Sequence, residues 1–182
     1  GLDIGKPSGC MVLDIGGGTT DVAVISLGEI VSSTSLKIAG DTLDRDIIKF
    51  VKENKKLLIG DRTAEEVKKQ IGTAWKGSMH ETIEVSGRDL VTGLPTTITL
   101  SSEEIQGSMA ESLQDVVRAC KTVLEQTPPE LASDIVTRGI VLTGGGALLH
   151  GIDELLRNEL HIPVYVAENG LRWVAEGTGI LL

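Results

Sequence analysis

Asp14-Ile15-Gly16-Gly17-Gly18-Thr19-Thr20-Asp21 is the stretch that decides the fold, and Thr143-Gly144-Gly145-Gly146 is its counterpart further along the chain. Each triple glycine directly follows a short apolar run, which predicts a buried strand. A glycine turn at a strand end lets backbone N–H groups approach an anion that a Cβ atom would keep away. We therefore predict a phosphate-binding loop at the first triple glycine and a second backbone surface for the same ligand at the other.

Two carboxylates frame the first loop. Asp14 ends an otherwise apolar run, so its side chain faces a cleft or requires an internal partner. Carboxylates do not bind phosphate directly, but Asp14 and Asp21 can hold the hydrated Mg²⁺ that accompanies it. The alternative for either triple glycine is a tight turn without a ligand. The two carboxylates favour nucleotide binding over that alternative.

The composition is that of a globular protein with an acidic balance. Of the 182 residues, 41% are hydrophobic and 24% are charged, which suits one domain or two small lobes. The net charge of −9 argues against a nucleic-acid partner and against strong attraction to an anionic membrane. No apolar run approaches the roughly 20 residues of a membrane span. The two cysteines and three histidines lack disulfide or zinc spacing, which favours a reducing, cytosolic compartment.

Several segments have the apolar or alternating pattern of strands. They are residues 11–15, 21–26, 30–37, 80–88, 96–100, 140–143 and 164–166. Short polar links between the first three predict an antiparallel meander, and the turn around Gly93-Leu94-Pro95 predicts a hairpin.

Helix start signals lie between these strands. Asp41 is the expected N-cap of one helix, and the patterns Thr63-x-x-Glu66 and Ser101-x-x-Glu104 predict capping boxes for two more. The last of these opens a helical region to about residue 126, with Gly107 and Ser108 as candidate breaks. Further helices are expected up to about residue 160 and up to residue 179.

The middle of the chain is richer in charge and turn signals than its flanks. We interpret residues 41–110 as a lobe inserted into an α/β core that both chain ends form. The chain begins at Gly1 without an initiator Met, so we expect a piece of a longer protein.

Several motifs occur in the order seen in the MreB family of bacterial actin homologues. They lie at residues 14–21, 40–44, 67–72, 127–131 and 143–152. Over essentially its whole length the chain resembles MreB and its Mbl-type paralogues, within the superfamily of actins, heat-shock chaperones and sugar kinases. The resemblance implies the second half of an α/β, ribonuclease-H-like fold: a mixed sheet flanked by helices, with an inserted small α+β subdomain. It places residues 1–40 plus 111–182 in the core (IIA-like) subdomain and 41–110 in the inserted (IIB-like) one.

The resemblance also implies roles for the first glycine loop and its carboxylates. The second phosphate loop of the family, whose N–H groups contact β- and γ-phosphates, corresponds to Gly16, Gly17, Gly18 and Thr19. Asp14 corresponds to the residue that orients Mg²⁺ through water. Asp21 lies where the family places the residue that positions the attacking water. Many relatives carry Glu there, and Asp is one methylene shorter.

Other motif positions correspond to contacts with the nucleoside. Glu65 and Lys68 match helix positions that touch the ribose and the base edge. Their alternative is a solvated i,i+3 ion pair, worth a few tenths of a kcal/mol. The loop that packs against the adenosine corresponds to Gly144, Gly145, Gly146 and Ala147. The chain departs from the family pattern at Gly170-Leu171-Arg172-Trp173, where Trp173 is expected to be half-buried.

The function implied by the resemblance is that of the nucleotide-binding half of an MreB-like cytoskeletal ATPase. ATP or ADP with Mg²⁺ would bind it, and filaments in the cytoplasm beneath the membrane would direct cell-wall synthesis and rod shape. Nothing in the chain matches the first phosphate hairpin of the family, so the chain alone is expected to lack efficient ATPase activity.

Expected partners are other subunits, a RodZ-like membrane protein and the cell-wall synthesis machinery, with membrane association through the missing half or these partners. Two alternatives stay open. One is half of a small-molecule kinase, which would need a substrate base that no segment convincingly supplies. The other is an interaction module that no longer uses nucleotide.

Overall fold

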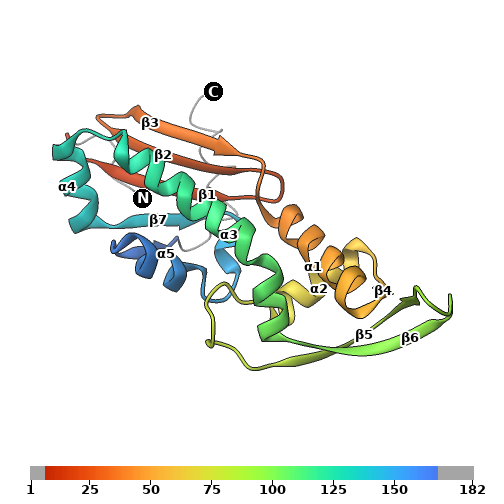
Figure 1. Ribbon diagram of the computed structural model, residues 1–182. Helices are drawn as coiled ribbons and strands as arrows, with labels where there is room; N and C mark the ends of the chain where they lie inside the picture. Colours follow the sequence, from red (N-terminus) through yellow and green to blue (C-terminus); the bar gives the residue numbers. More distant parts are fainter. Residues whose placement is uncertain (1–6, 168–182) are drawn as a thin grey trace.

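The computed structural model describes residues 7–167 of the chain. The elements follow in this order: β1 (Cys10–Ile15), β2 (Thr20–Ser26), β3 (Glu29–Leu36), α1 (Gly40–Lys55), β4 (Leu57–Leu58), α2 (Asp61–Ile71), β5 (Thr82–Asp89), β6 (Pro95–Ser101), α3 (Ser102–Glu125), α4 (Pro129–Arg138), β7 (Ile140–Thr143), the 3-10 helix η1 (Gly145–Leu148), α5 (Ile152–Leu160) and β8 (Val164–Val166). Figure 1 shows the larger sheet at one end of an elongated molecule and the β5–β6 hairpin at the other. The expected last helix and Trp173 lie outside the described residues.

The larger sheet has the strand order β3-β2-β1-β7-β8, with β1 in the middle. β1 pairs antiparallel with β2, which pairs antiparallel with β3, so the predicted meander is confirmed. Leu27 and Gly28, with φ angles of 54° and 78°, form the tight turn between β2 and β3. On the other side β1 pairs parallel with β7. The sheet is therefore mixed and flanked by helices, as predicted.

The smaller sheet has the order β4-β5-β6, and β5 and β6 form the predicted hairpin. Val85 and Leu100 are buried on the side of the hairpin that packs against α2 and α3. The turn between the two strands is well ordered by Asp89, whose Oδ1 accepts N–H bonds from Val91 at 2.7 Å and Thr92 at 2.9 Å. The Leu90 N–H donates to Lys56 O at 2.8 Å, which ties the turn to the segment that follows α1.

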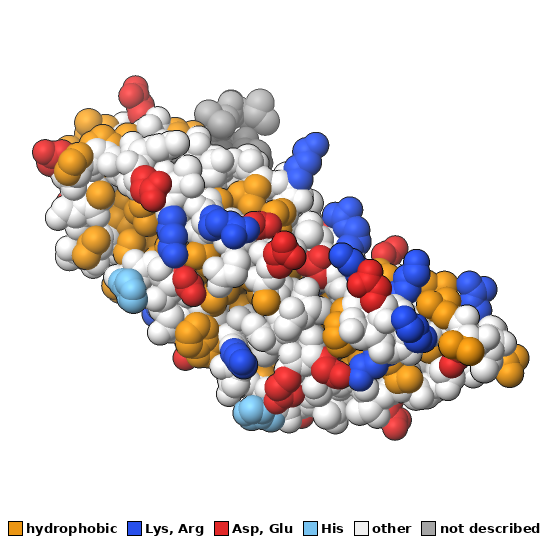
Figure 2. Space-filling view, in the orientation of Figure 1, with side chains coloured by type: hydrophobic (Ala, Val, Ile, Leu, Met, Phe, Trp, Pro, Cys, Tyr) orange, Lys and Arg blue, Asp and Glu red, His pale blue; other side chains and the backbone are white. Residues whose placement is uncertain are grey.

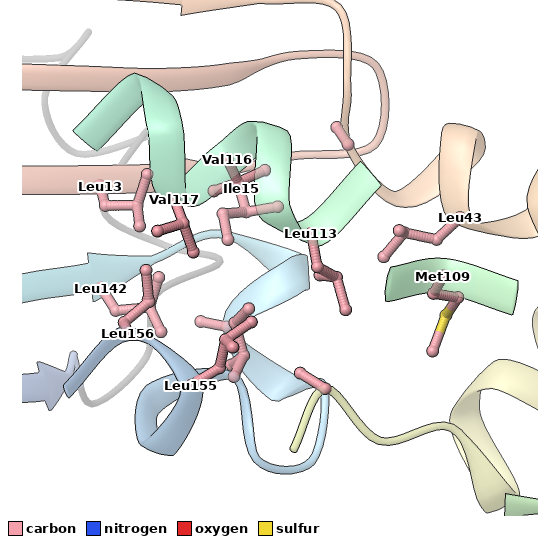
Figure 3. Close-up of a cluster of buried hydrophobic side chains, with 14 of the residues drawn as sticks. Leu13, Ile15, Leu43, Met109, Leu113, Val116, Val117, Leu142, Leu155 and Leu156 are labelled. Atoms are coloured by element: carbon pink, nitrogen blue, oxygen red, sulfur yellow. The ribbon is translucent and has the colours of Figure 1, made fainter. Parts of the chain in front are cut away.

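One hydrophobic core extends beneath both sheets, and α3 contributes side chains to its whole length. Figure 3 shows Leu13 and Leu142 of the larger sheet packed near Val117 of α3, while Met109 of α3 lies beside Leu43 of α1. α3 thus joins the two ends of the molecule through continuous apolar packing, which makes it the main structural link between the two sheets.

α3 continues unbroken from Ser102 to Glu125, so the predicted break at Gly107 and Ser108 is wrong. Gly107 is exposed, and a Cβ atom there would meet nothing within 4 Å. One exposed glycine costs a helix about 1 kcal/mol, which the buried stripe of α3 outweighs. The expected subdomain boundary between residues 110 and 111 falls inside this helix.

The capping box at the start of α3 is confirmed. Ser101 Oγ accepts the Glu104 N–H at 3.3 Å, and Glu104 Oε2 accepts the Ser101 N–H at 3.1 Å. The box predicted at Thr63 is wrong, because α2 begins earlier, at Asp61, with Gly60 as its N-cap. Thr63 is already inside the first helical turn, where its hydroxyl cannot cap the helix.

The N-cap predicted at Asp41 is also wrong. α1 begins at Gly40, and its N-cap is Ala39. The Gly40 N–H donates to Gly16 O at 3.1 Å, and the Asp41 N–H donates to Gly17 O at 2.8 Å. Carbonyl groups of the first glycine loop therefore accept the N–H bonds at the start of α1, a task that was expected of a side chain.

Ser101→Ala should lower the free energy of unfolding by about 1 kcal/mol, because the Glu104 N–H loses the Ser101 hydroxyl that accepts its hydrogen bond. Thr63→Ala is the matched control, and it should leave stability unchanged or raise it slightly, since Ala has the higher helix propensity. Urea unfolding followed by circular dichroism measures both variants. Equal losses for the two variants would contradict the assigned helix starts.

Candidate functional site

Parallel pairing of β1 with β7 brings the two glycine loops together. The register places Asp14 beside Thr143, so both loops leave the same edge of the sheet. Gly144 has a φ of 85°, and a Cβ atom there would lie 2.3 Å from Asp14 Oδ1 and 2.4 Å from Ile15 O. A Cβ atom at Gly146 would lie 2.3 Å from Ile15 Cγ2. Glycine is therefore required for the loops to pack this closely.

Unlike Gly144 and Gly146, Gly17 and Gly18 of the first loop have no close contact that requires glycine. The Gly16 N–H closes the loop by donating to Thr19 O at 2.9 Å. A Cβ atom at Gly18 would meet nothing within 4 Å, and one at Gly17 would lie 3.6 Å from Asp41 Oδ1, an ordinary contact. Neither residue has a positive φ. The described chain thus gives no internal reason for two adjacent glycines, which points to an outside group that approaches the backbone.

A cleft of about 780 Å³ lies beside these loops, with α1 and α2 on its other walls. It collects residues that are far apart in the sequence. The predicted site residues on its wall are Gly16, Gly17, Glu65, Lys68, Gly145 and Gly146. The remaining predicted loop residues belong to the same two loops without lining the cleft; they are Gly18, Thr19, Gly144 and Ala147.

Asp14 and Asp21 lie side by side on β1 and β2, next to the first loop. Burial raises the pKa of Asp14, and the charge of Asp21 raises it further. Thr19 Oγ1 donates a hydrogen bond to Asp21 Oδ2 at 3.2 Å. Within residues 7–167, no group of three or more His, Cys, Asp or Glu side chains could hold a metal ion. A cation here would therefore depend on water and ligand oxygens for most of its coordination.

The two charged residues predicted on α2 have separate partners. Glu65 pairs with Lys69 one turn along the helix, with 2.6 Å between Oε1 and Nζ. Lys68 Nζ lies 2.8 Å from Asp44 Oδ1 on α1 and donates to Gly40 O at 3.0 Å. The i,i+3 pair between Glu65 and Lys68, kept as the alternative, is therefore wrong, because α1 provides Lys68 with a better partner.

The structure adds cleft residues that the sequence patterns did not single out. Leu148 lies just after the second glycine loop with 74% of its surface exposed, and Leu149 follows it on the same wall. Asp61 and Arg62 at the start of α2 and His150 also line the cleft. The apolar Leu148-Leu149 pair directly behind a glycine loop was the signal available in the sequence. One side of the cleft is therefore apolar, and the side formed by α1 and α2 is charged.

The protein-family model described as MreB/Mbl protein matches residues 1–182. The cell shape-determining protein Mbl of Bacillus cereus is 57% identical over 182 residues, which are 100% of this chain and 55% of that protein. The cell shape-determining protein MreB of Escherichia coli is 52% identical over 179 residues, covering 98% of this chain and 52% of that protein. The chain thus spans about half the length of the curated relatives it matches.

Several solved structures are similar to this chain. The crystal structure of MreB5 of Spiroplasma citri bound to ADP has a TM-score of 0.95 and 42% identity, covering 100% of this chain and 55% of that one. A second crystal structure of that protein, bound to AMPPNP, has a TM-score of 0.94. A MamK double helical filament has a TM-score of 0.73 at 21% identity, a similarity that extends to the fold alone.

Asp14→Asn should raise the melting temperature at pH 7. The raised pKa of Asp14 means that the ionised carboxylate costs the folded state free energy above that pKa. The advantage of the variant should therefore fade as the pH falls through the raised pKa of Asp14 toward the ordinary carboxyl value of about 4. Thermal unfolding from pH 7 to pH 4 measures this difference. A variant that is less stable at pH 7, and recovers on acidification, would show that Asp14 is stabilised as an anion.

Proposed function

The chain belongs to the MreB/Mbl family of cell shape-determining proteins, and we propose on this basis that it is the nucleotide-binding half of a filament-forming bacterial actin. The proposal divides it into a core of residues 1–40 plus 111–182 and an inserted lobe of 41–110, with adenine nucleotide in the cleft. The observation that carries the proposal is the open backbone at Gly17 and Gly18, next to a cleft of about 780 Å³.

The cleft suits a nucleoside diphosphate or triphosphate on three counts. Its volume falls within the roughly 300–1,000 Å³ of small-molecule sites. The open glycine backbone offers N–H groups to phosphate oxygens, since no Cβ atom blocks their approach. The exposed Leu148 beside the second loop provides an apolar wall for a flat base. The ADP and AMPPNP complexes of MreB5, which is 42% identical, support the same choice of ligand.

Asp14 and Asp21 are not among the residues that line the cleft, but they lie beside the first glycine loop and would form the reaction end of the site. Asp14 would hold a water of the Mg²⁺ shell, a task for which its ionised form is required. Asp21, exposed and beside the first loop, would orient the attacking water. When bound, Mg²⁺ would offset the phosphate charge. The residues fit a hydrated cation, because paired carboxylates can accept hydrogen bonds from its waters.

The activity of the whole protein is part of the proposal. With the phosphate contacts of one half alone, the transition state would be poorly organised, so this chain would bind nucleotide but hydrolyse ATP very slowly. In the intact protein, ATP-dependent filaments in the cytoplasm would direct cell-wall synthesis and rod shape. A RodZ-like membrane protein and the cell-wall machinery would be its partners. No described helix is long and apolar enough to cross a membrane.

Gly17→Val should weaken ADP binding at least tenfold, because the branched side chain enters the space over the open backbone. The fold should tolerate it, since Gly17 has neither a positive φ nor a close neighbour. Gly107→Val on the exposed face of α3 is the matched control, with ADP affinity expected unchanged. Isothermal titration calorimetry measures both. Wild-type affinity in Gly17→Val would mean that the first glycine loop is only a turn.

Surfaces for self-association lie at the two ends of the molecule. Leu27 of the β2–β3 turn and Ile30 at the start of β3 are 63% and 67% exposed, and Val91 and Leu94 of the β5–β6 turn are 81% and 65% exposed. Figure 1 places these turns at opposite ends, and Figure 2 shows hydrophobic side chains at both. Two different apolar ends suit a head-to-tail contact, which repeats without closing. These turns would form the longitudinal contact of the filament.

This chain, added in excess, should slow the polymerisation of a full-length relative by occupying filament ends. Val91→Asp should remove most of that inhibition, because a charge would enter an apolar contact. Thr99→Asp, on the exposed face of β6, serves as the control and should still inhibit. Sedimentation of polymer measures the effect. Equal inhibition by both variants would rule out the β5–β6 turn as a filament contact.

A further inference from the structure

We propose that Lys68 is a positioning residue: it ties α2 to the start of α1 and thereby fixes the first glycine loop in its binding shape. The inference depends on the proposed function only for the identity of the ligand, because the link itself is within the chain. It differs from the role implied by the resemblance, in which Lys68 touches the nucleoside.

Lys68 lines the cleft, and both contacts of its ammonium group are with α1. Lys68 Nζ lies 2.8 Å from Asp44 Oδ1 and 3.0 Å from Gly40 O, and both charged side chains are 14% exposed. Within the described residues, Asp44 Oδ1 is buried and has no other partner. Removal of the ammonium would leave a buried carboxylate oxygen unpaired, which is more costly than the loss of a solvated ion pair.

Gly40 connects this ion pair to the glycine loop. Its carbonyl accepts from Lys68, while its N–H donates to Gly16 O at 3.1 Å and the next N–H, of Asp41, donates to Gly17 O at 2.8 Å. A Cβ atom at Gly40 would lie 3.4 Å from Gly16 O and 3.5 Å from Lys68 Nζ, so the three segments meet there. The position of the first turn of α1, which Lys68 holds, therefore sets the position of the loop carbonyls.

The other cations of α2 lack such a connection. Lys69 is 66% exposed and pairs with Glu65, and Arg62 is 92% exposed and pairs with Glu66. Both are i,i+4 pairs within one helix in solvent, a type worth only about 0.3–0.5 kcal/mol. Lys69 lines the same cleft and is the next residue along the chain. It is therefore a matched control for the loss of one positive charge beside the ligand.

Amide hydrogen–deuterium exchange of the nucleotide-free chain tests the link directly. In Lys68→Met, the Gly40 and Asp41 amides, which bond the loop carbonyls, should exchange about tenfold faster than in the wild type. Asp44→Asn, a milder change, should give an increase in the same direction. Lys68→Arg should restore most of the protection, because it keeps the charge opposite Asp44. Lys69→Met should leave these amides unchanged.

Two results would overturn the proposal. One is unchanged protection of these two amides in Lys68→Met. The other is faster exchange that spreads over the whole chain and is not reversed by Lys68→Arg, which would indicate general loss of structure. Neither result requires nucleotide binding, so the test is decided even if the proposed ligand is wrong.

Binding of ADP and adenosine separates positioning from direct contact with the nucleoside. If Lys68 positions the phosphate loop, Lys68→Met should weaken ADP at least fivefold and leave adenosine affinity unchanged. If Lys68 instead touches the ribose, both ligands should weaken by the same factor, and the proposal would fail.

Discussion

The parallel pairing of β1 with β7 is the constraint on which the rest of the site depends. It brings together two strands from opposite ends of the chain, and it places Asp14 beside Thr143. Because both strands end at the same sheet edge, the two glycine loops must share one small space. They fit only because Gly144 and Gly146 carry no side chain. A Cβ atom at Gly144 would lie 2.3 Å from Asp14 Oδ1, and one at Gly146 would lie 2.3 Å from Ile15 Cγ2. The cleft opens beside this contact.

α1 and α2, which belong to the proposed inserted lobe, complete the cleft, so the attachment of this lobe to the larger sheet matters as much as the loops. α3 attaches it through continuous packing, and the first turn of α1 attaches it through the carbonyls of the first loop. A further link joins the segment after α2 to the segment after η1: Ala74 N–H donates to His150 O at 2.8 Å, and Thr73 Oγ1 lies 3.1 Å from His150 Nδ1. A change in the orientation of the proposed lobe relative to the larger sheet would therefore alter at least one of these links.

Apart from β4, local patterns predicted the described strands, and they also predicted the hairpin and the capping box at Ser101, because each depends on neighbouring residues. They could not predict contacts between distant segments. The start of α1 is satisfied by the Gly17 carbonyl rather than by an Asp41 side chain, and Lys68 pairs with Asp44 on another helix rather than with Glu65. Likewise α4 was not predicted, although Pro129 is its first residue and proline is common at the first position of a helix. The glycine loops were visible in the sequence, but their contact required the fold.

The central claim is that both glycine loops face one adenine nucleotide. Titration of the isotope-labelled chain with ADP, followed by the amide signals in NMR spectra, tests it most directly. The account predicts saturable shifts of Gly16, Gly17 and Gly18 together with Gly145 and Gly146. Shifts confined to other parts of the chain, or no saturable shift of either loop at millimolar ADP, would contradict it.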